Sequence, residues 1–527
     1  MAMKRILAFA AAAALAFGLT ACSSDSGSGG GGGGTDYVTV NGSEPQNPLV
    51  PGNTNETGGG SLLDVLFAGL SYYDTEGKIH NELAESIEKE GDTTYRVTLQ
   101  EGKKFTDGTT VKAENFVKAW NYTVENSLLM ASFFEPIKGF EEGKPLEGLK
   151  VIDDKTFTIE LAQPEADFPL RLGYAAYFPL PDVAFEDMDA FGENPVGNGP
   201  YKLAEWNHNQ DAILEPNPDY DGPRKAKNDG VKFIFYPNFD AAYADLLAGN
   251  LDVLDTIPDS AFANYEQELG DRQVNQASAV FQSFTIPEKL EHFSGAEGEL
   301  RRAAISMAID RDSVTDKIFK GTRTPATDFT SPAIDGHSES LKGADVLEYN
   351  PEKAKELWAK ADAMNKFTGE FTIAYNADGG HQSWVDAVTN NIKNTLGIEA
   401  VGKPYPDFKS LRDEITNRTI SSAFRTGWQA DYPSLGNFLS PIYATNASSN
   451  DGDYSNPEFD AMLKKAAAAD DVEESLKLYN EAQEILLKDL PVIPLWYSNV
   501  TAGWSENVDN VAFNWKSRAE LHLVTKK

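Results

Sequence analysis

Stretches with strand-like alternation and stretches with helical spacing follow one another along the whole chain. Apolar residues recur at every second position in the first kind and at every third or fourth position in the second. This order predicts an α/β or mixed α+β fold built from several lobes. We expect strands near residues 37–40, 95–99, 156–161, 231–236, 251–254 and 371–375, and helices near 112–124, 241–247, 300–308, 351–361, 384–392 and 458–490.

One more helix is expected after a loop at residues 53–60 that is rich in Gly and Asn. Ser61 has a side chain that is typical of a helix N-cap. If Ser61 caps this helix, four leucines fall on one of its faces, namely Leu62, Leu63, Leu66 and Leu70.

The first residues of the chain predict export. Lys4 and Arg5 precede an apolar run at residues 6–19 that is too short to span a bilayer comfortably. Small residues then lead to Cys22, the only cysteine, and a tether with six consecutive glycines follows. Residues 19–22 look like a bacterial lipobox, so we expect a signal peptide at 1–21, a lipid on Cys22 and a tether at 22–34. A plain secretory signal with a chance cysteine is the alternative.

Size and charge limit the possible partners. Removal of residues 1–21 leaves 506, enough for two or three domains, and changes the formal net charge from −35 to −37 because Lys4 and Arg5 are lost. A surface this acidic argues against nucleic acid and against adhesion to anionic lipid. No second long apolar segment follows the signal, so we expect nothing beyond Cys22 to cross a membrane.

Catalytic and metal-binding patterns are missing from the sequence. We find no G-x-S-x-G motif, no H-E-x-x-H motif and no P-loop. The six histidines lack ligand spacing, and no cysteine lies near them. We therefore expect no enzyme, no cofactor and no metal, although a hydrolase with a carboxylate pair stays open as a less favoured alternative.

Two segments carry the functional prediction. Residues 194–201 combine glycines, asparagines and two prolines, which indicates a hinge or a crossing between domains. Residues 424–433 read as a short strand broken at Pro433, where Gly427 permits close approach of another backbone. Arg425 and Asp431 give this strand both signs of charge, which suits a zwitterionic ligand. The alternative is an internal ion pair between Arg425 and Asp431 at the edge of a core.

From about residue 35 to the end, the chain resembles the extracytoplasmic solute-binding proteins of the peptide/nickel class of ABC importers, especially the oligopeptide-binding proteins. Each matching segment is weak alone, but together they follow the family order over nearly the whole chain. They lie at residues 66–70, 83–86, 102–108, 196–201, 217–220, 300–311, 350–354, 424–433 and 489–495.

This resemblance implies a periplasmic-binding-protein-like clamp with two main lobes and an extra one. Lobe I comprises residues 35–78, 197–287 and 497–527. Lobe II is 79–196 and lobe III is 288–496. Lobes I and III are expected to close on the ligand.

The resemblance also implies roles for residues near the strand. Asp431 matches the aspartate that pairs with the free amino terminus of a bound peptide, and Gly427 and Gln429 should offer main-chain groups to it. Trp428 is expected to wall a side-chain pocket. Arg425 and His381 match positions that meet a short peptide's carboxylate, although His381 can also be a plain helix-start residue.

The remaining site residues rest on weaker correspondence. Asn55, Glu56 and Thr57 fall where the family presents a backbone strand, although their Gly- and Asn-rich surroundings depart from its pattern. Phe408 lies near a family aromatic. Trp496 and Tyr497 either line the cleft or pack in the core. A family arginine between the Phe408 region and the strand has no clear counterpart, which leaves the preferred peptide length open.

The sequence thus predicts a monomeric, lipid-anchored receptor that captures oligopeptides and delivers them to a membrane permease, with ATP used by separate ATPase subunits. The same scaffold can instead bind an oligosaccharide, a nickel chelate or another solute. A cell-surface hydrolase and an adhesion or signalling lipoprotein are further alternatives.

Overall fold

A large mixed sheet organises the fold. The computed structural model describes residues 36–406, 408–447 and 449–527, so the expected signal peptide, Cys22 and tether lie outside the described residues. The sheet has eleven strands, and its hydrogen-bonded path runs in the order that follows. It comprises β15 (Glu399–Tyr405), β14 (Glu370–Asn376), β16 (Ala423–Gln429), β12 (Gln273–Thr285), β17 (Val492–Trp504), β11 (Val253–Leu254), β1 (Val38–Gly42), β10 (Val231–Phe235), β9 (Asp211–Pro216) and β8 (Tyr201–Asn207), with β13 (Arg323–Pro325) paired to β17.

Three smaller sheets complete the strands. The largest of them is antiparallel and comes entirely from residues 84–160. These sheets are formed by β4 (Ala84–Glu90), β5 (Thr94–Leu99), β7 (Thr156–Glu160) and β6 (Leu149–Val151), by β2 (Ser71–Tyr73) and β3 (Ile79–Asn81), and by β18 (Val508–Asp509) and β19 (Thr525–Lys526).

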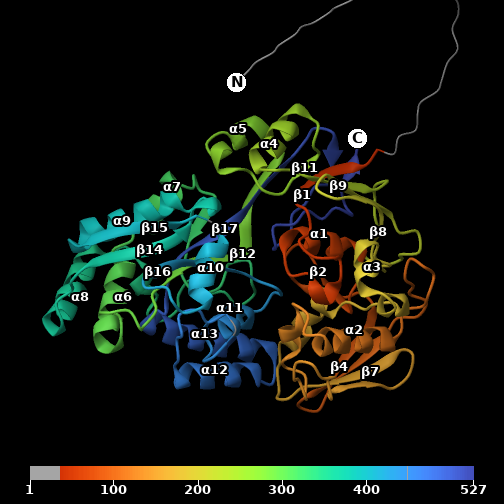
Figure 1. The fold of residues 1–527 in the computed structure, drawn as a ribbon, viewed down its shortest axis with the longest axis horizontal. Coiled ribbons are helices and arrows are strands. Elements are labelled where there is room, and N and C mark those ends of the chain that lie inside the picture. The colour runs from red at the N-terminus through yellow and green to blue at the C-terminus, as the bar shows by residue number, and fades with distance from the viewer. Residues whose placement is uncertain (1–35, 407, 448) are drawn as a thin grey trace, which may run out of the picture. The chain divides into compact units, whose positions relative to one another are not determined.

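Thirteen α-helices lie in the described part of the chain. Figure 1 shows α6, α8 and α9 beside β14 and β15, and α2 beside the sheet that contains β4 and β7. The helices are α1 (Thr57–Leu66), α2 (Ala113–Glu125), α3 (Met188–Glu193), α4 (Phe239–Ala248), α5 (Tyr265–Leu269), α6 (Gly295–Met307), α7 (Arg311–Lys317), α8 (Pro351–Met364), α9 (Gln382–Leu396), α10 (Phe408–Thr416), α11 (Leu435–Tyr443), α12 (Pro457–Ala467) and α13 (Val472–Asp489). No helix of the described residues is long and apolar enough to cross a membrane.

The strands β12 and β17 join the two ends of the large sheet. They pair antiparallel along their length, from Gln273 opposite Gly503 to Thr285 opposite Val492. One end of this pair adjoins β11 and the other adjoins β16. The pairing shifts register twice, between Ala277 and Val280 and between Gln282 and Ser283. Such bulges bend a strand and increase its twist.

The two largest hydrophobic cores of the described residues lie on either side of this crossing. One contains β1, α1, α2 and the sheet of β4–β7, together with residues 500–524. The other contains α4 and α5 together with α6, α8, α9 and α11–α13. The segments assigned to lobe II therefore share a core with part of lobe I. The three-lobe division remains an interpretation of this arrangement.

The start of α1 differs from the prediction that Ser61 caps it. The helix begins at Thr57, because the Glu56 carboxylate accepts a hydrogen bond from the Gly59 amide at 2.9 Å and so supplies the cap. The helix ends at Leu66, so Leu70 lies outside it, although its side chain is fully buried. The helix expected at 458–490 is divided into α12 and α13, since Asp471 caps a new helix by accepting from the Glu474 amide.

The turn-rich segment 194–201 connects α3 to β8 and packs on the end of α1. The Asn198 and Gly199 amides both donate to the Leu66 carbonyl oxygen, at 3.1 and 2.9 Å. A Cβ atom on Gly197 would lie 2.0 Å from that same oxygen. Glycine is therefore required here by the close approach of two backbones.

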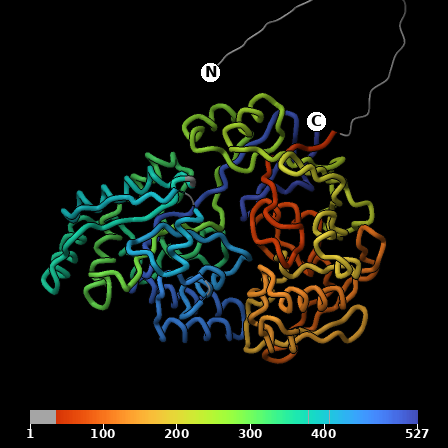
Figure 2. Tube along the Cα trace, viewed as in Figure 1, coloured from red at the N-terminus to blue at the C-terminus, as the bar shows by residue number. Residues whose placement is uncertain are grey.

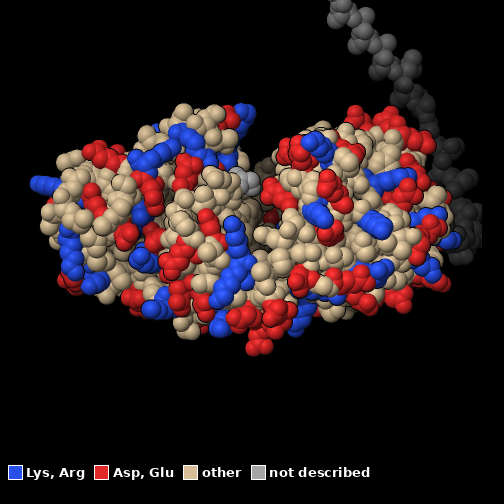
Figure 3. Space-filling view, turned by 90° about the horizontal axis from the view of Figure 1, so that it is seen from below, with Lys and Arg blue, Asp and Glu red and all other residues tan. Residues whose placement is uncertain are grey.

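The two ends of the described chain meet beside β1. The Lys526 ammonium lies 3.4 Å from the Asp36 carboxylate and 2.8 Å from that of Asp252. Figure 2 shows the red first strand next to the blue C-terminal segment. On the face seen in Figure 3, charges of both signs are interspersed, and Asp and Glu gather at its lower margin.

Candidate ligand-binding site

The strand β16 has an open edge next to the expected binding segment. On one side it pairs with β12 from Phe424 to Gln429. On the other side β14 pairs only with Ala423 and Phe424. Within the described chain, no strand covers the outer edge of residues 426–429, so this edge is suited to a peptide backbone.

Asp431 follows β16 and is held by the first turns of α11. Its backbone amide donates to Asn437 Oδ1 at 2.9 Å, and Asn437 Nδ2 donates to its carboxylate at 3.1 Å. Trp428 Nε1 also donates to Asn437 Oδ1, at 3.2 Å. Asn437 is itself buried, and through these bonds it fixes the positions of the predicted site residues Asp431 and Trp428.

The Asp431 carboxylate lacks a cation at contact distance. Across the described residues, no Lys, Arg or His lies within ion-pair distance of it, and Tyr174 is its other hydrogen-bond partner. Burial raises the pKa of Asp431, while the hydrogen bond from Asn437 and the charge of Lys516 oppose that rise. Such a buried carboxylate is expected to favour a cationic ligand group.

Lys516, the cation whose charge affects Asp431 most, lies among aromatic rings. Its ammonium lies 4.7 Å from the ring centre of Tyr174, 5.2 Å from that of Trp515 and 5.9 Å from that of Tyr73. Burial lowers the pKa of Lys516, and the negative charges of Asp64 and Asp431 act against this. Lys516 therefore acts on Asp431 by electrostatic attraction and not by a direct ion pair.

Three cavities surround the strand. The largest, about 870 Å³, is lined by Asn55, Trp428 and Asp431 and by segments between residues 129–174 and 428–479. A second, about 250 Å³, is lined by Phe408, Arg425, Gly427 and Trp428. Trp428 forms part of the wall of both, and a third cavity of about 300 Å³ includes Thr57 and Gln429.

The described residues contain no group of three or more His, Cys, Asp or Glu side chains placed to hold a metal ion. The site thus combines a buried carboxylate, an open strand edge and connected polar and aromatic walls. This combination serves binding.

Comparisons with known proteins agree with a binding role. Residues 78–450 match the family described as bacterial extracellular solute-binding proteins, family 5 Middle. The chain belongs to this family. As a family 5 solute-binding protein it shares with its relatives a binding function and not an enzymatic one. The predicted membership in the peptide/nickel class of ABC solute-binding proteins is confirmed.

Two relatives and one solved structure cover nearly the whole solute-binding protein. It is 30% identical over 482 residues to the periplasmic oligopeptide-binding protein OppA of Haemophilus influenzae, which covers 87% of each chain. It is 25% identical over 490 residues to the oligopeptide-binding protein OppA of Bacillus subtilis, which covers 88% of each. A structure of Haemophilus influenzae OppA in complex with RPPGFSPFR matches with a TM-score of 0.76 and 26% identity, over 93% of this chain and 99% of that one. The periplasmic-binding-protein-like mixed α/β fold is confirmed.

Several predicted residues of this solute-binding protein have described contacts with residues other than Asp431. Arg425 Nε donates to Asn376 Oδ1 at 2.9 Å, and its guanidinium lies 5.0 Å from the Phe408 ring centre, so the described contacts place it with these residues. His381 precedes α9 and accepts a hydrogen bond from Trp384 Nε1 at 3.1 Å. Glu56 caps α1, as described above.

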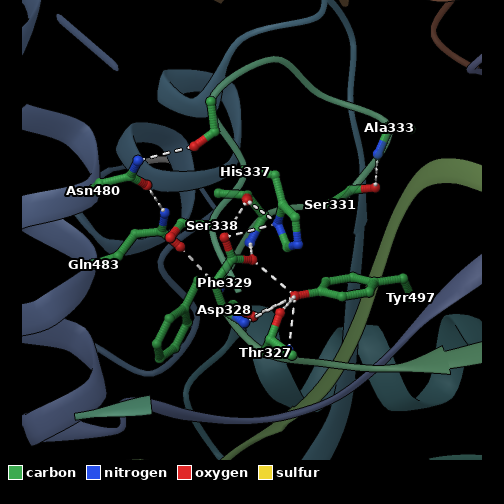
Figure 4. A network of polar contacts seen from close by, with 12 residues as sticks. Thr327, Asp328, Phe329, Ser331, Ala333, His337, Ser338, Asn480, Gln483 and Tyr497 are labelled. Carbon is green, nitrogen blue, oxygen red and sulfur yellow. Dashed lines mark hydrogen bonds and ion pairs between the residues drawn. The ribbon is translucent and has the colours of Figure 1, made fainter. Parts of the chain in front are cut away.

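The structure places Trp496 and Tyr497 in the core. Trp496 is fully buried and its Nε1 donates to Gln282 Oε1 at 2.5 Å. The Tyr497 hydroxyl donates to the Asp328 carboxylate at 2.8 Å and accepts from the Thr327 and Asp328 amides. His337 pairs with the same carboxylate at 2.9 Å, as Figure 4 shows. These hydrogen bonds and the His337–Asp328 pair hold the segment 327–337 against Tyr497 of β17.

Three residues at the site were missed by the sequence analysis. Asn437 lies six residues after Asp431 and shows no motif of its own. Tyr174 and Lys516 come from segments distant in sequence, and only the fold brings them to Asp431. A local pattern carries no signal for such contacts.

Proposed function

We propose that this protein is the substrate-binding component of an ABC importer and that it captures oligopeptides by their free amino terminus. The observation that carries the proposal is the buried Asp431 carboxylate, which has no ion-pair partner among the described residues and lies on the wall of the 870 Å³ cavity. A peptide ammonium would supply the missing charge.

Hydrogen bonds between the peptide backbone and the backbone of β16 would add to the affinity. The uncovered edge of residues 426–429 can accept an extended peptide as an added strand. Backbone hydrogen bonds do not depend on the side chains of the peptide, so this mode tolerates varied sequences. The oligopeptide-binding relatives described above support the same ligand class.

Anchoring and delivery complete the proposed role. Lipidation of Cys22 would hold the protein on the extracytoplasmic face of the cell membrane, a proposal that rests on the pattern of residues 19–22 and the tether. Ligand would shift the lobes toward a closed form that docks on the permease, while separate subunits use ATP.

Peptide binding can be tested by calorimetry on the purified protein after removal of co-purified ligand. We expect tetra- and pentapeptides with a free amino terminus to bind and the same peptides N-acetylated to bind much more weakly. Asp431→Asn should weaken binding of the free peptides by about tenfold to a hundredfold, as expected for loss of a hydrogen bond to a charged group.

The control is Asp182→Asn, which removes one exposed carboxylate that is not among the residues lining the cavity. Its partner Lys118 keeps Glu114 as a second partner. This control variant should leave peptide affinity unchanged. If neither peptide pool binds, or if acetylation makes no difference, the amine-recognition proposal is wrong and sugars or other solutes should be screened.

A further inference from the structure

The large cavity has a second charged wall, formed by a segment that the sequence analysis did not connect with ligand. Glu165, Asp167 and Arg171 lie between β7 and α3 and line the same cavity as Asp431. Arg171 pairs with Glu165, and its guanidinium lies 4.9 Å from the ring centre of Tyr432, the neighbour of Asp431. Recognition groups on both walls would therefore face one ligand.

Asp167 has one satisfied and one unsatisfied carboxylate oxygen. Ser434 Oγ donates to its Oδ2 at 2.5 Å, whereas the buried Oδ1 has no hydrogen-bond partner. The residue is only 4% exposed. A buried, unpaired carboxylate oxygen is unfavourable unless a donor reaches it, so this atom indicates a missing partner.

The cation of this wall is already engaged. Arg171 is paired with Glu165. Burial raises the pKa of Glu165 to about 7, and the neighbouring Asp167 charge adds to the rise while Arg171 opposes it. The phenols packed around the cluster, Tyr95, Tyr177, Tyr432 and Tyr479, bring no cation. Among the described residues, no ion pair reaches the Asp167 carboxylate, so a cationic ligand group would be its first.

We propose that Asp167 is a specificity-determining residue that binds the ammonium or guanidinium of a basic side chain in the peptide ligand. This inference rests on the proposed function, in which Asp431 binds the amino terminus. It adds the prediction that the protein prefers peptides with a Lys or Arg side chain placed to reach Asp167.

The test is calorimetry with tetrapeptides that place Lys at position 1, 2 or 3 of an alanine background. Matched peptides carry acetyl-lysine or Glu at the same position. We expect Lys at one position to bind at least fivefold more tightly than acetyl-lysine there, and Glu to bind most weakly. Asp167→Asn should remove the Lys advantage while it changes the affinity for tetra-alanine less than twofold. Asp182→Asn should preserve the advantage.

The outcomes separate this inference from the proposed function. If tetra-alanine fails to bind the wild-type protein, the proposed function itself fails. If tetra-alanine binds but Lys gives no advantage at any position, or if Asp167→Asn retains that advantage, the role of Asp167 is refuted. If Asp167→Asn proves unfolded in a thermal melt, a second measurement on the wild-type protein tests the charge contact. The Lys and acetyl-lysine peptides are then compared at 50 and 500 mM salt. A charge contact predicts an advantage that shrinks at high salt.

Discussion

At the scale of single residues, burial determines what a charge does in this protein. Asp431 and Asp167 are both carboxylates that the fold takes out of water without a contacting cation. Arg311, by contrast, is buried with its donors satisfied by the carbonyl oxygens of Ser306, Leu347 and Pro494. The buried charge of Arg311 thus has its partners within the fold, whereas the two incomplete carboxylates line the cavity proposed to hold the ligand.

Partly buried His522 should make stability depend on pH. Burial lowers its pKa to about 4, and the charges of Arg224 and Lys227 act in the same direction. In the unfolded chain histidine titrates near pH 6.5, so between about pH 6.5 and 4 the unfolded state binds a proton that the folded state does not. The free energy of unfolding should therefore fall as pH falls through this window, by up to about 3 kcal/mol from this residue.

Urea unfolding of the wild-type protein and of His522→Gln at pH 7 and pH 4.5 measures this effect. Carboxylates titrate in both proteins, so they cancel in the difference. The wild type should lose more stability than His522→Gln. Equal losses in the two proteins would show that His522 does not control the pH dependence.

At the scale of elements, close backbone contacts fix the connections between helices and strands. Gly197 in the segment 194–201 should not tolerate a side chain, since its Cβ would lie 2.0 Å from the Leu66 carbonyl oxygen. We expect Gly197→Ala to destabilise the protein by about 1–3 kcal/mol, the cost typical of overpacking.

Gly60 offers a matched comparison within α1. Nothing lies within 4 Å of its added Cβ, so Gly60→Ala should be neutral or stabilise the helix by up to about 1 kcal/mol. Chemical denaturation of both variants checks the pair. A Gly197→Ala protein as stable as Gly60→Ala would contradict the packing described for residues 194–201.

Sequence patterns predicted elements best where periodicity and end signals coincide. The strands β5, β7 and β14 and the helices α2 and α8 lie within a few residues of their predicted ranges. The predicted cap at Ser61 was wrong because Glu56, five residues before Ser61, supplies the cap oxygen. The short helices α10 and α11 were not predicted, since neither has a long apolar repeat.

Most of the predicted residues that line the cavities lie in or just after β16, and Asn55 and Phe408 reach them from other segments. Asp431, Trp428 and Gly427 stand in one local motif, and the fold keeps them at neighbouring cavities. Asp167 and Lys516 reach the same region from segments more than eighty residues away in sequence, and the composition of a single chain carries no sign of such contacts.

At the scale of the whole molecule, the β12–β17 pair is the main structural link across the large sheet. Its two register shifts are the natural places for bending, because the ladder is interrupted there. We expect peptide binding to change the angle across this pair and to narrow the range of lobe positions.

Spin labels can measure this closure. Val151 and Met364 are 39% and 57% exposed and lie in segments assigned to lobes II and III, and Cys22 is the only native cysteine to replace. In the V151C/M364C protein, saturating free peptide should shorten and narrow the measured distance distribution, whereas the N-acetylated peptide should not. An unchanged distribution with bound peptide would exclude closure of this kind.

The position of β17 in the sheet also bears on how the chain is made and exported. This strand is formed by residues 492–504, more than 200 residues after β12, yet it lies between β12 and β11 in the middle of the sheet. Until β17 is available, the sheet consists of two separate halves with unpaired edges. The sheet can therefore close only after residues 492–504 have emerged, so export of the chain in an unfolded state is compatible with its topology.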